Sequence, residues 1–305
     1  MAAMTMPPRG RWQGVNRQLV ALSFILPGAV LLTAFLVVPF AQEIGYSFTN
    51  LRLISPLEPR NIGWQNYVRL LNDPLVRQAF TNNIVFVVVM VPLQTAFALW
   101  LAILVNQKIR GIKWFRTIFF APVVTVMAAA ATIWKLLYAP DGGMLDAFAN
   151  VVTLGHAQPN WLHDPHTALP AIMLMSLWQG AGFQMIVLLA ALQDIPQELY
   201  EATAMDGAGT WGQFTNVTLP QLRNTLIFVG TITTILAFRL FDQVFVLTQG
   251  GPVGATETLM TRIITIGFNE QKIGESSALA VLFFCVVLVL SLAQRIFLRE
   301  RGEVV

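Results

Sequence analysis

The sequence predicts an all-α, polytopic membrane protein with six transmembrane helices. Of its 305 residues, 55% are hydrophobic and only 11% are charged, whereas soluble chains usually have about 25% charged residues. A chain this apolar cannot cover a water-facing surface with polar groups, so lipid is the solvent that suits the excess.

Six apolar segments are long enough to cross the hydrocarbon core, which takes about 20 residues in a helix. Five of them contain no Asp, Glu, Lys or Arg, and the remaining one is interrupted only by Arg239 and Asp242. Because backbone polar groups in lipid have to be satisfied within the element, these segments are expected to be helices. They are 18–42, 78–107, 117–134, 165–193, 224–248 and 276–294.

The distribution of Lys and Arg predicts the orientation of these helices. If the N-terminus is cytoplasmic, eleven basic residues lie on the inside and six on the outside. This bias predicts that both termini are cytoplasmic, together with the loop 193–223. The domains expected are a tail 1–18, a six-helix domain 19–298 and a tail 299–305. A secretory signal is the alternative for the N-terminal Arg cluster, but the apolar run is long for one and no small-x-small cleavage site follows.

Few residues have the chemistry of a metal or catalytic site. Cys285 is the only cysteine, so it excludes a disulfide within the chain and is expected to be a small packing residue. His156, His163 and His166 share one loop but lack standard ligand spacing, so no metal and no cofactor is expected. The sequence has no phosphate-binding Gly-Lys-Ser/Thr loop and no nucleophile elbow. This chain is therefore not expected to hydrolyse ATP.

The loop 193–223 is polar and has the local signals of two short helices joined by a glycine turn. Pro196 suits a first helical turn, and Gly207 suits the left-handed position that ends a helix. Thr210 and Gln213 have capping-box spacing, and Pro220 is expected to stop or kink the second helix. A DNA-binding helix-turn-helix is the rival interpretation. Residues 193–222 contain four acidic and no basic residues, so phosphate would be repelled and no nucleic acid partner is expected.

The same loop contains Glu201-Ala202-Thr203, then Gly207, then Val217-Thr218-Leu219-Pro220. This spaced pattern resembles the signature loop of the membrane subunits of binding-protein-dependent ABC importers. That pattern is Glu-Ala-Ala, three residues, Gly, nine residues, Ile, one residue, Leu-Pro. Here Thr203 replaces the second Ala and Val217 replaces the Ile, and the other positions match. The resemblance implies that the loop docks into a groove of a separate ATPase subunit, where the Glu pairs with a basic residue. The implied coupling residues are Glu201, Ala202, Asp206, Gly207, Leu219 and Pro220.

A second group of motifs resembles one of the two membrane subunits of carbohydrate-uptake importers of the maltose and glycerol-3-phosphate type. The likeness runs from about residue 20 to residue 295. It rests on Phe238–Asp242, Val246–Pro252, Thr256–Thr258, Gly63–Tyr67 with Asp73 and Pro74, Asn82, Asn83, Trp178, Gly182 and Phe183. The implied partners are a second permease, two copies of an ATP-binding subunit, an extracytoplasmic substrate-binding protein and the lipid membrane. The implied location is the bacterial plasma (inner) membrane.

Arg239 and Asp242 are three residues apart, so within one helix they would share a face. Charges inside a span are costly and usually face a partner or a water-filled path. Two interpretations stay open, an ion pair that packs the bundle and a role in the substrate path. Phe238 and Phe241 beside them could stack on sugar rings or simply pack the core.

The function predicted is a permease subunit for a sugar or related small polar solute. A glycerol phosphodiester or a polyol remains a possible cargo. A secondary transporter without an ATPase would be expected to show repeat symmetry and coupling-ion carboxylates in broken helices. An intramembrane enzyme would need a nucleophile and a base at membrane depth. Neither rival class accounts for the Glu201 pattern.

Overall fold

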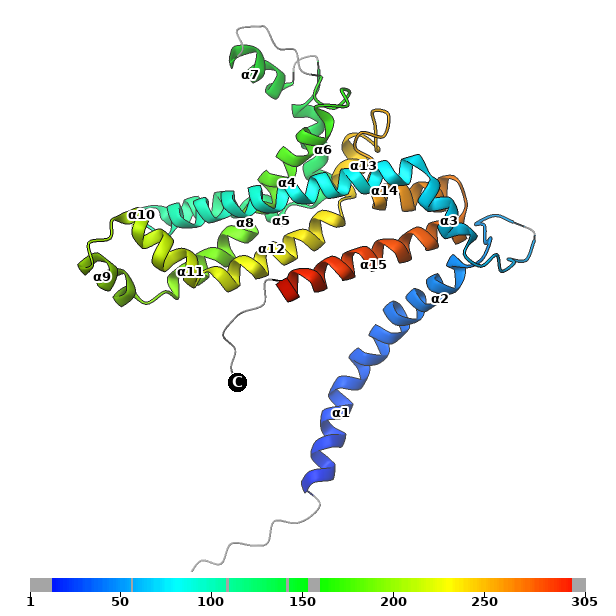
Figure 1. The fold of residues 1–305 in the computed structure, drawn as a ribbon, viewed down its shortest axis with the longest axis horizontal. Helices are drawn as coiled ribbons and strands as arrows, with labels where there is room; N and C mark the ends of the chain where they lie inside the picture. The colour runs from blue at the N-terminus through cyan, green and yellow to red at the C-terminus, as the bar shows by residue number, and fades with distance from the viewer. Residues whose placement is uncertain (1–12, 56, 108–109, 141–142, 153–159, 298–305) are drawn as a thin grey trace, which may run out of the picture.

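The computed structural model describes residues 13–55, 57–107, 110–140, 143–152 and 160–297 (Figure 1). The described segments are helices joined by turns and loops, with an isolated antiparallel bridge between Thr49 and Asn61. The predicted tail 1–18 lies partly outside the described residues, and the tail 299–305 lies wholly outside them.

Four helices of the described chain are long and apolar enough to cross a membrane, and two bent helix pairs pass the same test. Counting each bent pair as one span brings the number to as many as six. The all-α membrane architecture is therefore confirmed. The four long helices are Leu19–Ser47, Pro74–Val105, Ala168–Gln193 and Ile273–Gln294.

The helix α4 (Pro74–Val105) forms the centre of the bundle, and α8 (Ala168–Gln193) and α12 (Arg223–Phe238) pack along it. The buried face of α4 repeats every three or four residues, as one face of a helix does. Its members are Val76, Ala79, Asn83, Phe86, Met90, Gln94, Ala98, Leu101, Ala102 and Val105. Two of them, Asn83 and Gln94, are polar, which is unusual for a buried face and calls for hydrogen-bond partners.

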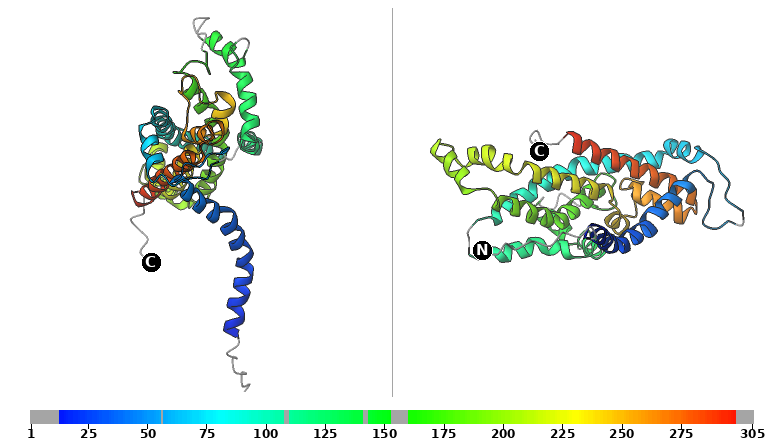
Figure 2. Two further views of the ribbon diagram at one scale, coloured as in Figure 1. Left: turned by 90° about the vertical axis from the view of Figure 1, so that its right-hand side faces the viewer. Right: turned by 90° about the horizontal axis from the view of Figure 1, so that it is seen from below.

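The N-terminal helix stands apart from the bundle. The helix α1 (Gln13–Leu32) continues through the π-helix η1 (Thr33–Val37) into α2 (Val38–Ser47), and α2 packs on α15 (Ile273–Phe297). The most apolar window of this long helix is 0% buried. It projects away from the other helices in Figure 1 and in the left view of Figure 2. A helix apolar on all sides needs lipid or another protein around it.

The third predicted span, 117–134, is wrong as a single helix. The structure has α5 (Ile112–Val124) and α6 (Met127–Leu137), bent by 101° at the break. Pro122 lies in the last turn of α5, and Thr125 and Val126 adopt extended backbone angles. Proline cannot donate a backbone hydrogen bond, so the helix is weakest there.

The fifth predicted span, 224–248, is also wrong as a single helix. The helix α12 ends at Phe238, and α13 (Asp242–Leu247) begins after a short break. Arg239 caps α12, whereas Asp242 opens α13. The two charged residues therefore do not share one helix face, contrary to the prediction.

The remaining described helices are short and lie between or beside the long ones. The short elements are α3 (Gln65–Asn72), α7 (Met144–Val152), α9 (Gln197–Met205), α10 (Thr210–Gln213), η2 (Phe214–Thr218), α11 (Leu219–Gln221), α14 (Leu259–Ile264) and η3 (Thr265–Asn269).

Cys285 on α15 is exposed in this chain, so the prediction of a packing residue is wrong here.

Candidate functional site

The acidic loop forms two short helices at one end of the molecule, opposite the end that holds α3 (Figure 1). The first, α9, follows Pro196 and ends in a glycine turn, as the sequence indicates. Gly207 has φ of 81°, and its N–H donates to the Ala204 carbonyl at 3.0 Å. The Ala208 N–H donates to the Thr203 carbonyl, also at 3.0 Å. This pair of bonds is a Schellman motif, which glycine accommodates without strain.

The second helical stretch runs from α10 through η2 to α11. The predicted capping box is wrong, because Thr210 is already helical and Gly209 precedes the helix without a side-chain cap. The stretch Thr210–Gln221 then meets α12 at a bend of 65°. Pro220 lies in the last turn before this bend, in agreement with the kink predicted from the sequence.

The two short helices are held together by polar contacts. The hydroxyl of Tyr200 and that of Thr218 lie 3.0 Å apart, and Gln213 donates to the Tyr200 carbonyl at 3.3 Å. Val217, Thr218 and Leu222 are buried beneath them. The loop is thus a built unit with fixed internal geometry.

All six predicted coupling residues lie on the surface of this unit. Glu201, Ala202, Asp206, Gly207, Leu219 and Pro220 are all exposed. Two apolar side chains that the motif did not single out are exposed further, Met205 to 89% and Trp211 to 74%. Large apolar residues in an otherwise polar loop were the sequence signal that could have identified them. Together these residues form a mixed acidic and apolar surface.

A groove of about 740 Å³ separates the two short helices from the ends of α4 and α8. Glu201 and Tyr200 line it from α9, and Gln213 and Phe214 line it from the second stretch. Asn106 lines it beside the end of α4. Glu201 therefore lies at a concave edge of the loop and remains open to solvent.

A second cleft, of about 510 Å³, opens between α4, α8, α12 and α13. Its lining mixes apolar side chains with many amides and hydroxyls. The polar lining residues are Gln94, Ser176, Gln179, Gln184, Thr233, Arg239, Asp242 and Gln243. The side-chain amide of Gln243 donates to the Ser176 hydroxyl at 3.2 Å. The side-chain amide oxygen of Gln184, Oε1, is buried with no protein partner. The cleft therefore presents neutral hydrogen-bonding groups together with one positive and one negative side chain.

The structure separates the predicted substrate-path residues into two groups. Arg239 and Asp242 are exposed and line the 510 Å³ cleft. Among the described residues, no ion pair within 4.0 Å joins them. Phe238 is fully buried and Phe241 stacks on Phe245 with ring centroids 5.3 Å apart, and neither Phe238 nor Phe241 is part of the cleft lining. The ion-pair interpretation fails in this structure, and the path interpretation stays a prediction.

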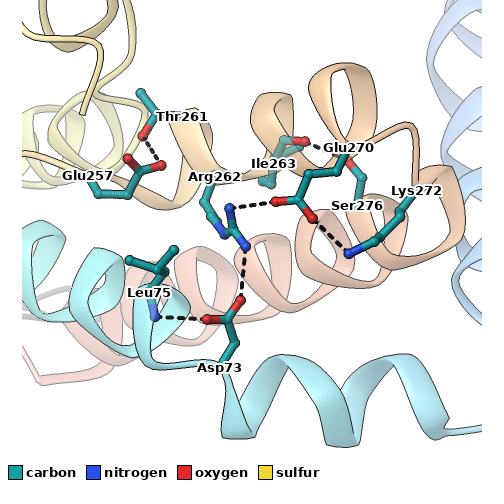
Figure 3. Close-up of polar contacts among 9 residues, drawn as sticks. All are labelled: Asp73, Leu75, Glu257, Thr261, Arg262, Ile263, Glu270, Lys272 and Ser276. Carbon is teal, nitrogen blue, oxygen red and sulfur yellow. Dashed lines mark hydrogen bonds and ion pairs between the residues drawn. The ribbon is translucent and has the colours of Figure 1, made fainter. Parts of the chain in front are cut away.

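A charged network lies at the α3 end of the bundle (Figure 3). Asp73 caps α4 by accepting the Leu75 N–H at 2.8 Å, and it pairs with Arg262 at 3.1 Å. Arg262 also pairs with Glu270 at 2.8 Å, and Lys272 pairs with Glu270 at the same distance. The hydrogen bond from Lys272 holds the pKa of Glu270 below its ordinary value, and the nearby Arg262 acts in the same direction.

The Gly-Gly-Pro segment lies next to this network. Gly250 has φ of 87°, and a side chain there would collide with the carboxylate of Glu257. Glu257 accepts a hydrogen bond from the Thr261 hydroxyl at 3.1 Å (Figure 3). Burial raises the pKa of Glu257, and the Thr261 hydrogen bond and Arg262 oppose that shift. The left-handed backbone angle therefore favours glycine at this position, and a side chain there would also displace the Glu257 carboxylate.

The described residues hold no group of three His, Cys, Asp or Glu side chains arranged for a metal ion. His156 lies outside the described residues. His163 and His166 are exposed in the loop before α8.

Comparison with known proteins identifies the family of this chain. The family described as "Binding-protein-dependent transport system inner membrane component" matches residues 74–301. The probable ABC transporter permease protein YurN of Bacillus subtilis is 34% identical over 292 residues, covering 94% of this chain and 99% of that protein. The lactose transport system permease protein LacF of Rhizobium radiobacter is 32% identical over 306 residues, covering 99% and 100%.

A solved structure has the same fold. It is a bacterial alginate ABC transporter in complex with an alginate pentasaccharide-bound periplasmic protein, with a TM-score of 0.83 at 21% identity. The match covers 95% of this chain and 97% of that chain. The chain therefore belongs to the permeases of binding-protein-dependent ABC importers, in the carbohydrate-uptake family, and is a multi-pass inner-membrane transport subunit that is not itself an enzyme.

Proposed function

We propose that this chain and a second permease together form the path by which a sugar or related small polar solute enters the cell. An extracytoplasmic binding protein delivers the solute, and two copies of a separate ATP-binding subunit drive the cycle. The name of the lactose relative and the saccharide-bound periplasmic protein of the alginate transporter support this assignment. ATP-driven closure shifts the bundle between two packings, each open to one side.

The loop that holds α9 and α10 is the contact with the ATP-binding subunit in this proposal. The observation that carries it is the exposed α9, which bears Glu201 and ends in the left-handed turn at Gly207. An acidic, rigid projection is a suitable partner for a basic groove. Met205 and Trp211 add apolar area at the tip, where interface anchors are usually found.

The 510 Å³ cleft is the part of the path that this chain contributes. Its amides and hydroxyls can replace the water that hydrates sugar hydroxyls, and Arg239 and Asp242 offset each other in charge. This balance favours a neutral solute over an anionic glycerol phosphodiester. Phe86, on α4, and Phe183, on α8, add apolar area to the lining.

The proposed orientation places both termini and the acidic loop in the cytoplasm. The excess of Lys and Arg in the segments on that side supports it. The loop then faces the compartment in which ATP is available, and the α3 end faces the binding protein.

The charge of Glu201 provides the direct test. In the assembled importer, Glu201→Lys should lower ATP-dependent uptake by at least tenfold, since loss of a desolvated interfacial charge pair costs about 2–5 kcal/mol. Glu198→Lys is the matched control, because Glu198 lies on the same helix and is exposed but is not part of the groove lining. Membrane abundance and co-purification of the ATP-binding subunit should be measured for both. Normal uptake by Glu201→Lys with that subunit bound would refute the docking role.

A further inference from the structure

The break between α12 and α13 leaves backbone carbonyls that no helix satisfies. The last carbonyls of a helix have no partner within it, and a buried carbonyl without a partner is costly. Phe238 and Leu240, at the end of α12 and just beyond it, are both buried. Their carbonyl oxygens are satisfied by side chains from two other parts of the chain.

The first of these side chains is Asn83, in the buried face of α4. Its amide nitrogen donates to the Phe238 carbonyl at 3.2 Å. Its amide oxygen accepts the N–H of Leu259, the first residue of α14, at 2.8 Å. Asn83 is 0% exposed, so both halves of its amide depend on these partners. A single side chain therefore joins the end of α12 to the start of α14.

The second side chain is Thr258, the residue that caps α14. Its hydroxyl donates to the Leu240 carbonyl at 2.9 Å. The same oxygen accepts the Thr261 N–H at 3.3 Å, which completes a capping box for α14. Thr258 is 0% exposed. Asn83 and Thr258 thus hold the end of α12 and the break itself against the same short helix, and we call these two residues the clamp.

The clamp lies directly beside the 510 Å³ cleft. Phe86 and Met90 follow Asn83 by three and seven residues, lie on the same face of α4 and line the cleft. Arg239, within the break, and Asp242, the first residue of α13, line the cleft too. Both charged residues occupy the break or its immediate end, so their positions follow the position of the clamp.

We propose that Asn83 and Thr258 are positioning residues of the substrate path, which fix the helix break and thereby hold Arg239 and Asp242 at the wall of the cleft. This inference rests on the proposed role of the cleft. Release of the clamp leaves buried polar groups without partners, and the break has to move to find new ones. The clamp touches no solute, so its effect appears as a change in the position of α13.

The adjacent residue provides a matched control. Asn82 is also in α4, but its amide donates to the carbonyls of Gly254 and Glu257, at 3.0 and 2.9 Å. These two hydrogen bonds hold the loop after the Gly-Gly-Pro run, and neither of them reaches the break. Asn82→Leu and Asn83→Leu therefore make the same chemical change one residue apart, and only Asn83→Leu removes a hydrogen bond to Phe238, at the break.

The experiment measures the accessibility of the cleft to a thiol reagent in membranes that contain the whole importer. In a Cys285→Ser background, Asp242→Cys reports on the break, and Gln179→Cys reports on the α8 wall. A charged methanethiosulfonate reagent is applied to vesicles of both orientations. Asn83→Leu should change the labelling rate of Asp242→Cys by roughly tenfold, the shift that loss of the hydrogen bond to the Phe238 carbonyl can produce. It should leave Gln179→Cys unchanged, and Asn82→Leu should leave both unchanged.

Thr258 provides an independent arm. Thr258→Val removes the hydroxyl and keeps the shape, so it should change the labelling rate of Asp242→Cys as Asn83→Leu does. Thr258→Ser keeps the hydroxyl, so it should leave that labelling rate at the parent value. Equal effects of Asn82→Leu and Asn83→Leu, or an unchanged Asp242→Cys rate in Asn83→Leu, would overturn the clamp. Absence of labelling at both reporters in every background would overturn the proposed path as well, which separates the two failures.

Discussion

The carboxylate of Asp73 lies 3.1 Å from the guanidinium of Arg262, although 189 positions separate the two residues in sequence. This ion pair joins the start of α4 to α14. The first residue of α14, Leu259, also donates its N–H to the clamp residue Asn83. The Arg262 side chain is 11% exposed and that of Asp73 20%, so the pair is mostly removed from water. The α3 end of the bundle is therefore tied by one charged residue with two acidic partners, Asp73 and Glu270.

Removal of Arg262 should strongly destabilise this end. Arg262→Met leaves Asp73 without its cation and leaves Glu270 with Lys272 as its remaining partner, and breaking a buried pair on one side costs about 3–5 kcal/mol. Thermal unfolding of the purified chain in detergent measures the effect. Arg69→Met is the control, since Arg69 is exposed on α3 and should change the midpoint little. Equal midpoints for the two variants would show that the network contributes nothing.

Glu270 should make stability fall in acid. Its folded-state pKa is lowered by Lys272 and Arg262, so its contribution is fully present above the ordinary carboxyl pKa. This contribution is lost as the pH falls through the lower folded-state value. Glu270→Gln should remove that part of the acid sensitivity, as seen in unfolding midpoints measured on either side of the ordinary value. An unchanged pH profile in the variant would contradict this assignment.

Glu257 should affect the pH dependence of stability in the opposite direction from Glu270. Burial raises its folded-state pKa, so the folded chain holds this proton more tightly than the unfolded chain does. Its effect on stability therefore becomes unfavourable as the pH rises from the ordinary carboxyl value through the folded-state value. Glu257→Gln keeps the shape and removes the charge, so it should raise the unfolding midpoint at neutral pH. A lower midpoint for this variant would mean that the attraction of Arg262 outweighs burial.

Arg239 and Asp242 should contribute independently to transport. The sequence predicts one shared helix face, but the structure places a break between them and no ion pair within 4.0 Å. Arg239→Ala and Asp242→Ala should therefore have additive effects on the logarithm of the uptake rate, within about 0.3–0.5 kcal/mol. A double-mutant cycle measures this, and a large coupling energy would restore the ion-pair interpretation.

Gly207 should be required for coupling through its backbone angle alone. Its φ is 81° and nothing lies within 4 Å of the position where a side chain would begin. Gly207→Val should lower ATP-coupled uptake about five- to thirtyfold with normal membrane abundance, because a left-handed angle costs a residue with a side chain roughly 1–2 kcal/mol. Gly209→Val is the control, since Gly209 also has open space and has φ of −70°. If both variants lost uptake equally, added bulk would explain the loss.

The positive-inside count supports a topology that thiol labelling can check. Val151 and Trp211 are exposed to 75% and 74%, so cysteines there are equally accessible in the isolated chain. In the Cys285→Ser background, an impermeant reagent should label Val151→Cys from outside the cell and Trp211→Cys only in inverted vesicles. Labelling of Trp211→Cys in intact cells would reverse the orientation.

Hydropathy and spacing alone determined the membrane class and most of the loop geometry. Long apolar runs are a local property, because a helix in lipid satisfies its own backbone. The turn at Gly207 and the kink near Pro220 are local as well, since each follows from the backbone limits of one residue. For this reason the four long spans and the acidic loop could be found by reading along the chain.

Only the tertiary structure decided where the helices break and which charges pair. At the break after Phe238, the side-chain amide of Asn83, 155 positions away, donates a hydrogen bond to the Phe238 carbonyl. Nothing local at positions 239–241 signals that partner. Asp73 and Arg262 come together for the same reason, through the packing of α4 against α14. Partners distant in sequence carry no periodicity or spacing, so their contacts could be seen only in the folded chain.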